Sequence, residues 1–195
     1  MLRSIHRILL IDDDFDARLL SERALKKSLT AHSTVHLVHS GNQAIRYMIG
    51  EGQYADRRKY PFPTLVITDI NMPDGDGFDV LEFLQTNPEW GVVPRIVVSS
   101  SNDDDDVRTA FLLGASAYHL KPIGYQELSE FMRTLLGYWT LSEVPPVDET
   151  GRLLTTNSSG RRGARFPQPK GGAAMKRPRP RSASALSASK ASDAG

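Results

Sequence analysis

The sequence predicts an α/β fold in which helices cover both faces of an open parallel β-sheet. Short apolar runs recur between residues 8 and 120, each run is followed by a polar turn, and a helical pattern then follows. Five such strand-then-helix units favour a doubly wound sheet, because right-handed crossovers place the helices on both of its faces.

The five apolar runs are the predicted strands. Their isoleucine, valine and leucine residues are nearly unbroken, which is typical of strands that are buried on both faces. The predicted strands are Ile8 to Ile11, Val35 to Val38, Leu65 to Ile67, Ile96 to Val98 and a weaker run from Ala117 to Leu120.

Five amphipathic segments between and after these runs are the predicted helices. The first carries Leu19, Leu20, Ala24 and Leu25 on one stripe, as a helix that packs on a sheet requires. The predicted helices are Asp16 to Ser28, Asn42 to Ile49, Phe78 to Gln85, Asp104 to Leu113 and Gln126 to Tyr138.

The composition changes sharply near Pro145. Residues 1–144 carry 14 Lys/Arg and 20 Asp/Glu, a net charge of −6, whereas residues 145–195 carry 10 and 3, a net charge of +7. The second segment consists mainly of Gly, Ser, Ala, Pro and Arg, and it has too little apolar area to offset the entropy of ordering. We expect a globular domain over 1–144 and a disordered, basic, low-complexity tail over 145–195. Such a tail can bind nucleic acid, but a solvated extension is the commoner role.

Several classes of protein are excluded by what the sequence lacks. It contains no cysteine, which excludes disulfides and thiolate catalysis and agrees with a reducing, cytoplasmic location. The first apolar run is cut off by acidic residues and does not resemble the core of a signal peptide. No segment approaches the roughly 18 uncharged apolar residues of a transmembrane helix, so we expect no membrane span.

Polar residues follow four of the predicted strands. Because the carboxyl ends of parallel strands meet at one edge of the sheet, where doubly wound folds bind ligands, we expect these residues to form one site. They are Asp12, Asp13 and Asp14 after the first strand, Asp69 after the third, Ser99, Ser100 and Ser101 after the fourth, and Lys121 and Pro122 after the fifth.

The chemistry of this predicted site follows from its charges. Carboxylates held close together repel one another unless a cation or a lysine compensates them. Mg²⁺ suits a site with few carboxylates, and the main-chain carbonyl of Asn71 can supply an uncharged ligand. No cluster of His and Cys favours zinc. A cation and a lysine beside a carboxylate nucleophile are typical of phosphoryl transfer.

Some of the acidic residues have an alternative role as helix caps. Asp12, Asp13 and Asp14 precede a predicted helix, whose positive N-terminus favours carboxylates, so capping remains an alternative for this triplet. The run from Asp103 to Asp106 is interpreted as the cap and first turn of the fourth helix. The five histidines do not form a convincing set of metal ligands.

Four segments together resemble the signature of a known family. The segments ILLIDDD, LVITDINMPDGDGF, RIVVSSS and GASAYHLKPI are similar, in this order and spacing, to those of the receiver domain of two-component response regulators. The resemblance extends from about Arg7 to Tyr138. It implies a flavodoxin-like fold, with a five-stranded parallel sheet in the order 2-1-3-4-5 and five flanking helices.

The resemblance also implies a role for each residue that matches the family's motifs. Asp69 matches the phosphoacceptor, and Ser99 and Tyr118 match the switch hydroxyl and the switch aromatic residue, with Ser100 as the alternative for the hydroxyl. Lys121 matches the lysine that pairs with a phosphoryl oxygen, and its bond to Pro122 matches a cis peptide of the family. The matching metal ligands are Asp12, Asp13, Asp69 and the carbonyl of Asn71.

The partners implied are a sensor histidine kinase and an unidentified downstream protein, because the tail is too biased to be an output domain. The long segment at residues 50–63 and the ending GYWTLSEVPP resemble single-domain regulators that are paired with bacterial phytochromes. Many of those regulators form homodimers through their fourth and fifth elements. The resemblance implies a switch that at most dephosphorylates itself, and not an enzyme acting on other substrates.

Two alternatives to a phosphorylated switch remain open. The first is a phosphorylation-independent receiver scaffold that acts through its helical face or its basic tail. The second is a phosphatase of the haloacid dehalogenase type, which also uses a strand-end aspartate and Mg²⁺. Asn71 disfavours the phosphatase, because those enzymes carry an acid at this position.

Overall fold

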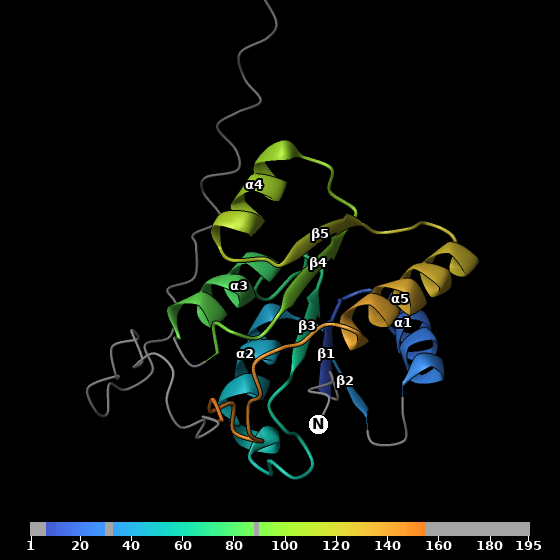
Figure 1. Ribbon diagram of the computed structural model, residues 1–195. Helices are drawn as coiled ribbons and strands as arrows, with labels where there is room; N and C mark the ends of the chain where they lie inside the picture. The colour runs from blue at the N-terminus through green and yellow to red at the C-terminus, as the bar shows by residue number, and fades with distance from the viewer. Residues whose placement is uncertain (1–6, 30–32, 88–89, 155–195) are drawn as a thin grey trace, which may run out of the picture.

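The computed structural model describes residues 7–29, 33–87 and 90–154. Its five parallel strands form one sheet in the order β2-β1-β3-β4-β5, as the sequence predicted (Figure 1). In the centre of the sheet, Leu9 lies opposite His36 on one side and Val66 on the other. The strands are β1 (Arg7–Ile11), β2 (Thr34–Val38), β3 (Leu65–Thr68), β4 (Arg95–Ser99) and β5 (Ala117–Leu120).

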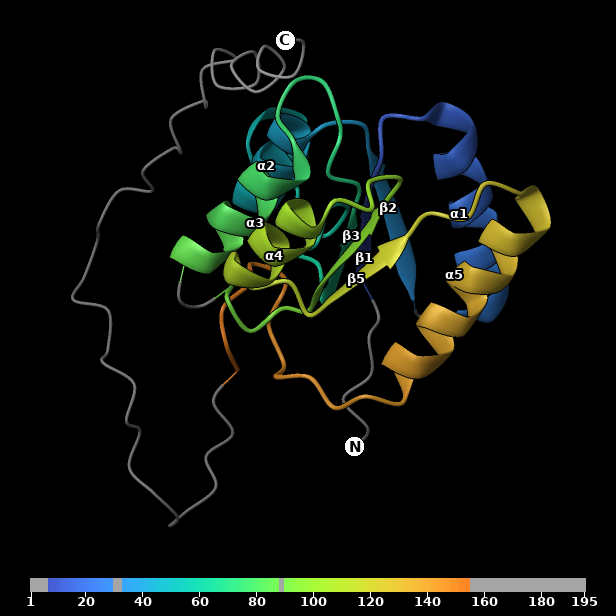
Figure 2. The ribbon, with the colours of Figure 1, turned by 90° about the horizontal axis from the view of Figure 1, so that it is seen from above.

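Helices cover both faces of this sheet. Helices α1 and α5 lie on one face, and α2, α3 and α4 lie on the other, which confirms the doubly wound arrangement (Figure 2). Within the described residues, no helix is long and apolar enough to cross a bilayer. The helices are α1 (Phe15–Ser28), α2 (Gly41–Ile49), α3 (Gly77–Thr86), α4 (Asp104–Leu112) and α5 (Tyr125–Thr140), and a 3₁₀ helix, η1, spans Gly52–Tyr54.

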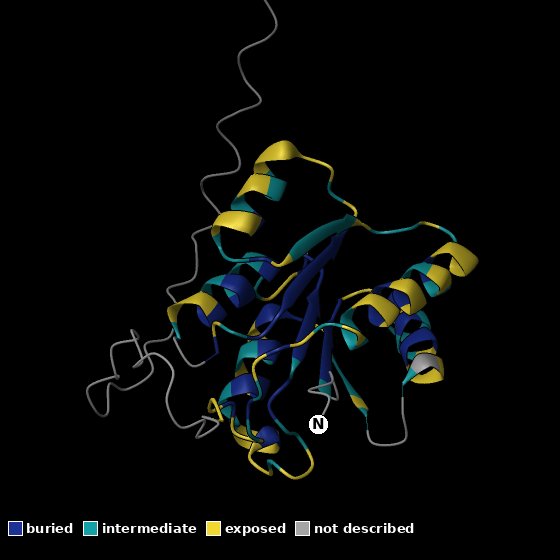
Figure 3. Ribbon diagram, in the orientation of Figure 1, coloured by how far each residue is buried: buried dark blue, intermediate teal, exposed yellow. Residues whose placement is uncertain are grey.

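The alternating side chains of β1 divide the core between the two faces. Leu9 and Ile11 pack in a cluster with residues of α2 and α3, whereas Ile8 and Leu10 pack in a cluster with residues of α1 and α5. All four are almost completely buried, and the central strands are dark in Figure 3. The sheet is therefore a rigid frame with apolar packing on both sides.

Aspartates begin three of the helices. The Asp14 carboxylate caps α1 by accepting hydrogen bonds from the amides of Asp16 and Ala17, and Asp103 caps α4. Asp76 begins α3 in a capping box with Asp79. The capping interpretation is therefore confirmed for Asp103, and within the first acidic triplet it applies to Asp14.

The predicted boundary at residue 145 is wrong, because the ordered structure continues to Leu154. We call residues 145–154 the C-terminal strap. Its Val147 is 6% exposed, and the amide of Phe62 donates to the Glu149 carbonyl at 2.9 Å. The Arg7 guanidinium donates to the Val147 carbonyl at 2.7 Å. The composition predicted disorder here because it does not reveal these contacts, which are all made with distant parts of the chain. The rest of the predicted tail, residues 155–195, lies outside the described residues.

The long segment before β3 is also ordered. Gly50 ends α2 with a φ of 74°, a conformation that glycine adopts readily. The Arg57 guanidinium donates to the carbonyls of Tyr47 and Met48 near the end of the same helix. The Tyr54 ring packs 5.1 Å from the Tyr47 ring, measured between centroids. This segment and the strap together close the end of the sheet at which β1 and β3 begin.

Candidate functional site

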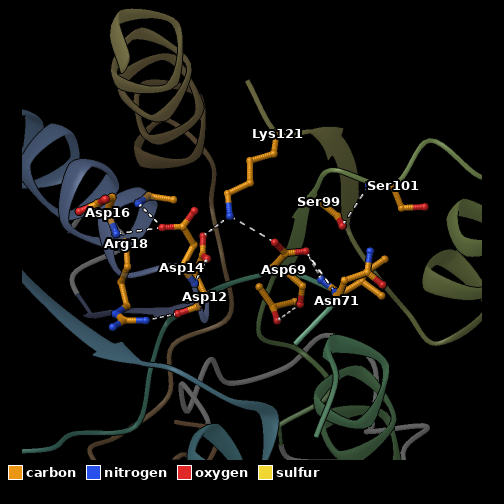
Figure 4. A network of polar contacts seen from close by, with 12 residues as sticks. Asp12, Asp14, Asp16, Arg18, Asp69, Asn71, Ser99, Ser101 and Lys121 are labelled. Atoms are coloured by element: carbon orange, nitrogen blue, oxygen red, sulfur yellow. Dashed lines mark hydrogen bonds and ion pairs between the residues drawn. The ribbon is translucent and has the colours of Figure 1, made fainter. Parts of the chain in front are cut away.

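Two carboxylates and a lysine meet at the carboxyl edge of the sheet. The Lys121 ammonium follows β5, and its Nζ lies 2.6 Å from an oxygen of Asp12 and 3.2 Å from an oxygen of Asp69 (Figure 4). Asp12 and Asp69 are 4% and 6% exposed. Since the three residues follow three different strands, the sheet brings them together as the sequence predicted.

The Asp69 carboxylate is oriented by the backbone as well as by Lys121. One of its oxygens accepts hydrogen bonds from the amides of Ile70 at 2.6 Å and Asn71 at 3.2 Å. The other oxygen faces Lys121. The amide of Asp69 donates to the carbonyl of Ile11 at 2.9 Å, which ties the end of β3 to β1. The carboxylate is therefore held in one orientation at the edge of the sheet.

A divalent cation fits the acidic side chains of this site. Asp12, Asp13 and Asp69 can each offer a carboxylate oxygen, and these oxygens lie within 4.8 Å of one another. Asp13 is exposed, whereas the other two are buried. Hard cations prefer such oxygen ligands, and one exposed carboxylate leaves a side open to water.

Burial and the neighbouring charges shift the pKa values of Asp12 and Lys121. Burial raises the pKa of Asp12; Lys121 opposes that effect, and the Asp69 carboxylate adds to it. Burial on its own would lower the pKa of Lys121, but its contacts with Asp12 and Asp69 outweigh burial and raise the pKa above its usual value. Lys121 is therefore a fixed positive charge at neutral pH.

Asp69 and Lys121 line an open cleft of about 550 Å³. Part of its lining comes from Ile123, in the loop between β5 and α5, and from Tyr125, the first residue of α5, and both side chains are exposed. The polar residues that line the cleft include Asp13, Asp14, Asp16, Asp69, Asn71, Ser100 and Lys121.

A family model for the response regulator receiver domain matches residues 8–133 of this chain. The chain belongs to the receiver domain family. This match confirms the resemblance predicted from the sequence. Receiver domains act in two-component signal transduction. The doubly wound sheet and the strand-end aspartate agree with this assignment.

Two response regulators, Rcp1 and RcpA, are among the proteins similar to this receiver domain. Response regulator Rcp1 of Synechocystis sp. is 29% identical over 133 residues, which cover 68% of this chain and 87% of Rcp1. The crystal structure of the phosphorylated cyanobacterial phytochrome response regulator RcpA has a TM-score of 0.68 at 26% identity, over 73% of this chain and 100% of RcpA. The Mn²⁺-bound form of Rcp1 has a TM-score of 0.66 at 26% identity, over 72% of this chain and 99% of that one.

The two candidate switch serines of this receiver domain lie in different environments. Ser99, at the end of β4, is fully buried, and its hydroxyl accepts a hydrogen bond of 3.4 Å from the Ser101 amide. Ser100 is exposed and lines the cleft. Figure 4 shows Asp69 between Lys121 and Ser99. Ser99 therefore lies on the side of Asp69 that is opposite Lys121, whereas Ser100 lies in the lining of the cleft.

The predicted aromatic switch residue contacts the loop that follows β4. The Tyr118 hydroxyl donates to the Ser101 carbonyl at 2.9 Å, and burial raises the pKa of Tyr118. The Ser101 hydroxyl in turn donates to Asp106, in the first turn of α4, at 2.6 Å. These contacts link β5 to α4 next to the acidic site.

Arg18 and the contact between Ser101 and Asp106 were not predicted from the sequence, and one feature implied by the resemblance was wrong. Arg18 donates from α1 to the main-chain carbonyl of Asp12, and its place one helical turn after the Asp14 cap could have indicated this. The bond between Lys121 and Pro122 is trans, because no cis peptide occurs within the described residues. Trans is the form that X–Pro bonds generally prefer.

Proposed function

We propose that this receiver domain is a phosphorylation-dependent response regulator whose Asp69 accepts a phosphoryl group from a sensor histidine kinase. An Asp69 oxygen forms a bond to phosphorus while the bond from phosphorus to the imidazole nitrogen of the kinase's phosphohistidine breaks. The electron pair of that bond returns to the nitrogen. The observation that carries this proposal is the Asp69 carboxylate, held at the end of β3 beside Lys121 and Asp12.

The acidic side chains support Mg²⁺ as the cation of this site. Asp12, Asp13 and Asp69 would hold it, together with the main-chain carbonyl of Asn71. When bound, Mg²⁺ supplies positive charge that offsets the repulsion between these carboxylates and an incoming phosphoryl group. The Mn²⁺-bound form of the similar protein Rcp1 supports a divalent cation at this site.

Lys121 and the switch residues would hold the phosphorylated state. The Lys121 ammonium already contacts the Asp69 oxygen that faces it, so it can pair with a phosphoryl oxygen. A hydroxyl of Ser99, or of Ser100, would donate to a second oxygen. A movement of the loop after β4 then reaches Tyr118 through its bond to Ser101. Water that attacks phosphorus releases inorganic phosphate and regenerates the carboxylate, which resets the switch.

The similarity to a phytochrome response regulator supports a phytochrome kinase as the phosphoryl donor. Exposed apolar residues on α4 and β5 support a protein partner or a second copy of this chain as the output contact. Phe111, Leu112 and Leu120 are each at least half exposed there. Exposed large apolar side chains of this kind support a protein contact. We place this switch in the cytoplasm, where sensor kinases present their phosphohistidine.

The proposal is tested by the intact mass of the protein after incubation with acetyl phosphate and Mg²⁺. We expect a gain of about 80 Da, one phosphoryl group, that is absent in Asp69→Asn and absent without Mg²⁺. Asp104→Asn is the matched control, because it changes an exposed aspartate of α4 away from the cleft. No gain in the wild-type protein would favour a phosphorylation-independent scaffold instead.

A further inference from the structure

The loop between β3 and α3, residues 69–76, is fastened to the start of α2 by four hydrogen bonds. The Asp74 carboxylate accepts one bond from the Ser40 hydroxyl at 3.2 Å and another from the Asn42 side-chain amide at 2.9 Å. The amide of Gly41 donates to the Gly75 carbonyl at 2.8 Å, and the amide of Asn42 donates to the Asp74 carbonyl at 3.2 Å. We call Ser40, Asn42 and Asp74 the loop clamp.

The clamp holds Asp74 in an unusual backbone conformation. With a φ of 60°, it is the only residue other than glycine with a positive φ in the described ranges. Side-chain hydrogen bonds are what commonly allow aspartate to adopt this left-handed conformation. The loop and helix also touch closely, because a Cβ added to Gly41 would lie 2.6 Å from the Asp76 carbonyl oxygen. The position of the loop is therefore set by α2.

The clamp is connected to the cation site through a short and stiff stretch of backbone. Only Met72 and Pro73 separate Asp74 from Asn71. Met72 is 8% exposed and packs in the core with α2 and α3, and the ring of Pro73 fixes its own φ. On the other side, the amide of Asn71 donates to the Asp69 carboxylate. A displacement of Asp74 is therefore transmitted to Asn71 and Asp69.

We propose that Asp74 is a positioning residue for the cation site. Together with Ser40 and Asn42, it holds the loop so that the Asn71 carbonyl and the Asp69 carboxylate keep their places. None of the three clamp residues is among those that line the cleft, so the clamp acts through the backbone and not by contact with a ligand. This inference rests on the proposed Mg²⁺ site, and it adds a determinant outside that site.

The test is calorimetric titration of the full-length protein with Mg²⁺, without any phosphodonor. Asp74→Gly is the informative variant, because glycine adopts a φ of 60° without strain while both side-chain hydrogen bonds are lost. We expect its Kd for Mg²⁺ to rise about ten-fold. We also expect faster amide hydrogen exchange at Asn71 and Met72, which a contact that only stabilises the fold would not change selectively.

Asn42→Ala removes the hydrogen bond between the Asn42 side-chain amide and the Asp74 carboxylate by changing the donor instead of the acceptor. It serves as the second variant if Asp74→Gly fails to fold. The double variant with both Asn42→Ala and Asp74→Gly should bind Mg²⁺ no more weakly than Asp74→Gly alone, because the two side chains act as one unit. Asp104→Asn controls for the lost charge, and a charge effect alone would also disappear at high salt.

If Asp74→Gly changes the free energy of unfolding but leaves the Kd for Mg²⁺ unchanged, this proposal is overturned. A wild-type protein that binds no Mg²⁺ would overturn it as well. A protein that binds Mg²⁺ but takes up no phosphoryl group would contradict only the proposed function, and the two failures are thus distinguishable.

Discussion

The two ends of the central sheet are built in different ways. At the carboxyl end, Asp12, Asp69 and Lys121 follow their strands directly, and Lys121 forms an ion pair with each of the two aspartates. At the amino end, segments far apart in sequence close the sheet, and the strap packs beside Phe62 and Trp90, whose rings lie 4.8 Å apart. This fold therefore places its chemistry and much of its stabilisation at opposite ends of the sheet. Changes at one end should leave the other end intact.

The largest expected effect on stability comes from deletion of the strap. A chain that ends at residue 144 loses the burial of Val147 and the bonds to Arg7 and Phe62, so we expect its free energy of unfolding to fall by about 3 kcal/mol. Denaturant unfolding measures this change. A chain that ends at Leu154 is the matched control. Equal stability of the two truncated chains would contradict the role of the strap.

At the opposite end, Lys121→Ala should impair the chemistry. Loss of the ammonium that pairs with Asp69 should slow phosphoryl uptake from acetyl phosphate about 100-fold, which corresponds to about 2.7 kcal/mol. Intact mass measured over time gives the rate. Lys27→Ala, which changes an exposed lysine of α1, should react like the wild type. An equal rate for both variants would show that Lys121 serves only the resting structure.

A single methyl group in the strap should have a somewhat smaller effect. In Gly151→Ala the new Cβ would lie 2.6 Å from the indole nitrogen of Trp90, at a residue whose φ is 87°. We expect a loss of about 2 kcal/mol in unfolding free energy, with normal phosphoryl uptake by the folded protein.

Gly137→Ala is the matched control for this variant, because nothing lies within 4 Å of its added Cβ. Gly137 is within α5, where alanine should raise the unfolding free energy by about 0.5 to 1 kcal/mol. Changes of opposite sign in the unfolding free energy of the two variants would show that close packing in the strap, and not the added methyl group by itself, causes the loss. A loss of the same size at both sites would refute the packing argument for the strap.

The smallest expected effect is a pH dependence at the aromatic cluster near α2. Burial lowers the pKa of His36, whose ring packs 5.4 Å from the Tyr47 ring. Its contribution to stability is therefore present above the unfolded value of 6.5 and is lost as the pH falls below that value. Urea unfolding between pH 8 and pH 5 should show this decrease. His36→Phe should flatten it, whereas His39→Phe, at an exposed position, should not.

The fold and much of the candidate site could be predicted because their signals are local. The buried strands show unbroken apolar runs, and the carboxyl edge of a parallel sheet brings together whatever follows them, as Asp12, Asp69 and Lys121 do. The ends of most helices were predicted to within one residue, since caps such as Asp103 are also local.

The strap and the loop clamp could not be predicted, because each depends on contacts between distant residues. Nothing in the composition around Val147 indicates that Arg7 binds its carbonyl. In the same way, Asp74 belongs to an acidic turn in sequence, and only the position of α2 gives it partners. Local patterns specify elements and their ends, whereas the contacts of loops are settled by the packing of the whole chain.

The most direct test of this account locates the phosphoryl group. After reaction with acetyl phosphate and Mg²⁺, borohydride reduces an aspartyl phosphate to homoserine, which tandem mass spectrometry assigns to one position of the chain. We predict homoserine at position 69 in the wild-type protein and at no position in Asp69→Asn. Homoserine at Asp12 or Asp13 instead, or at no residue in the wild type, would contradict the assignment of Asp69 as the phosphoacceptor.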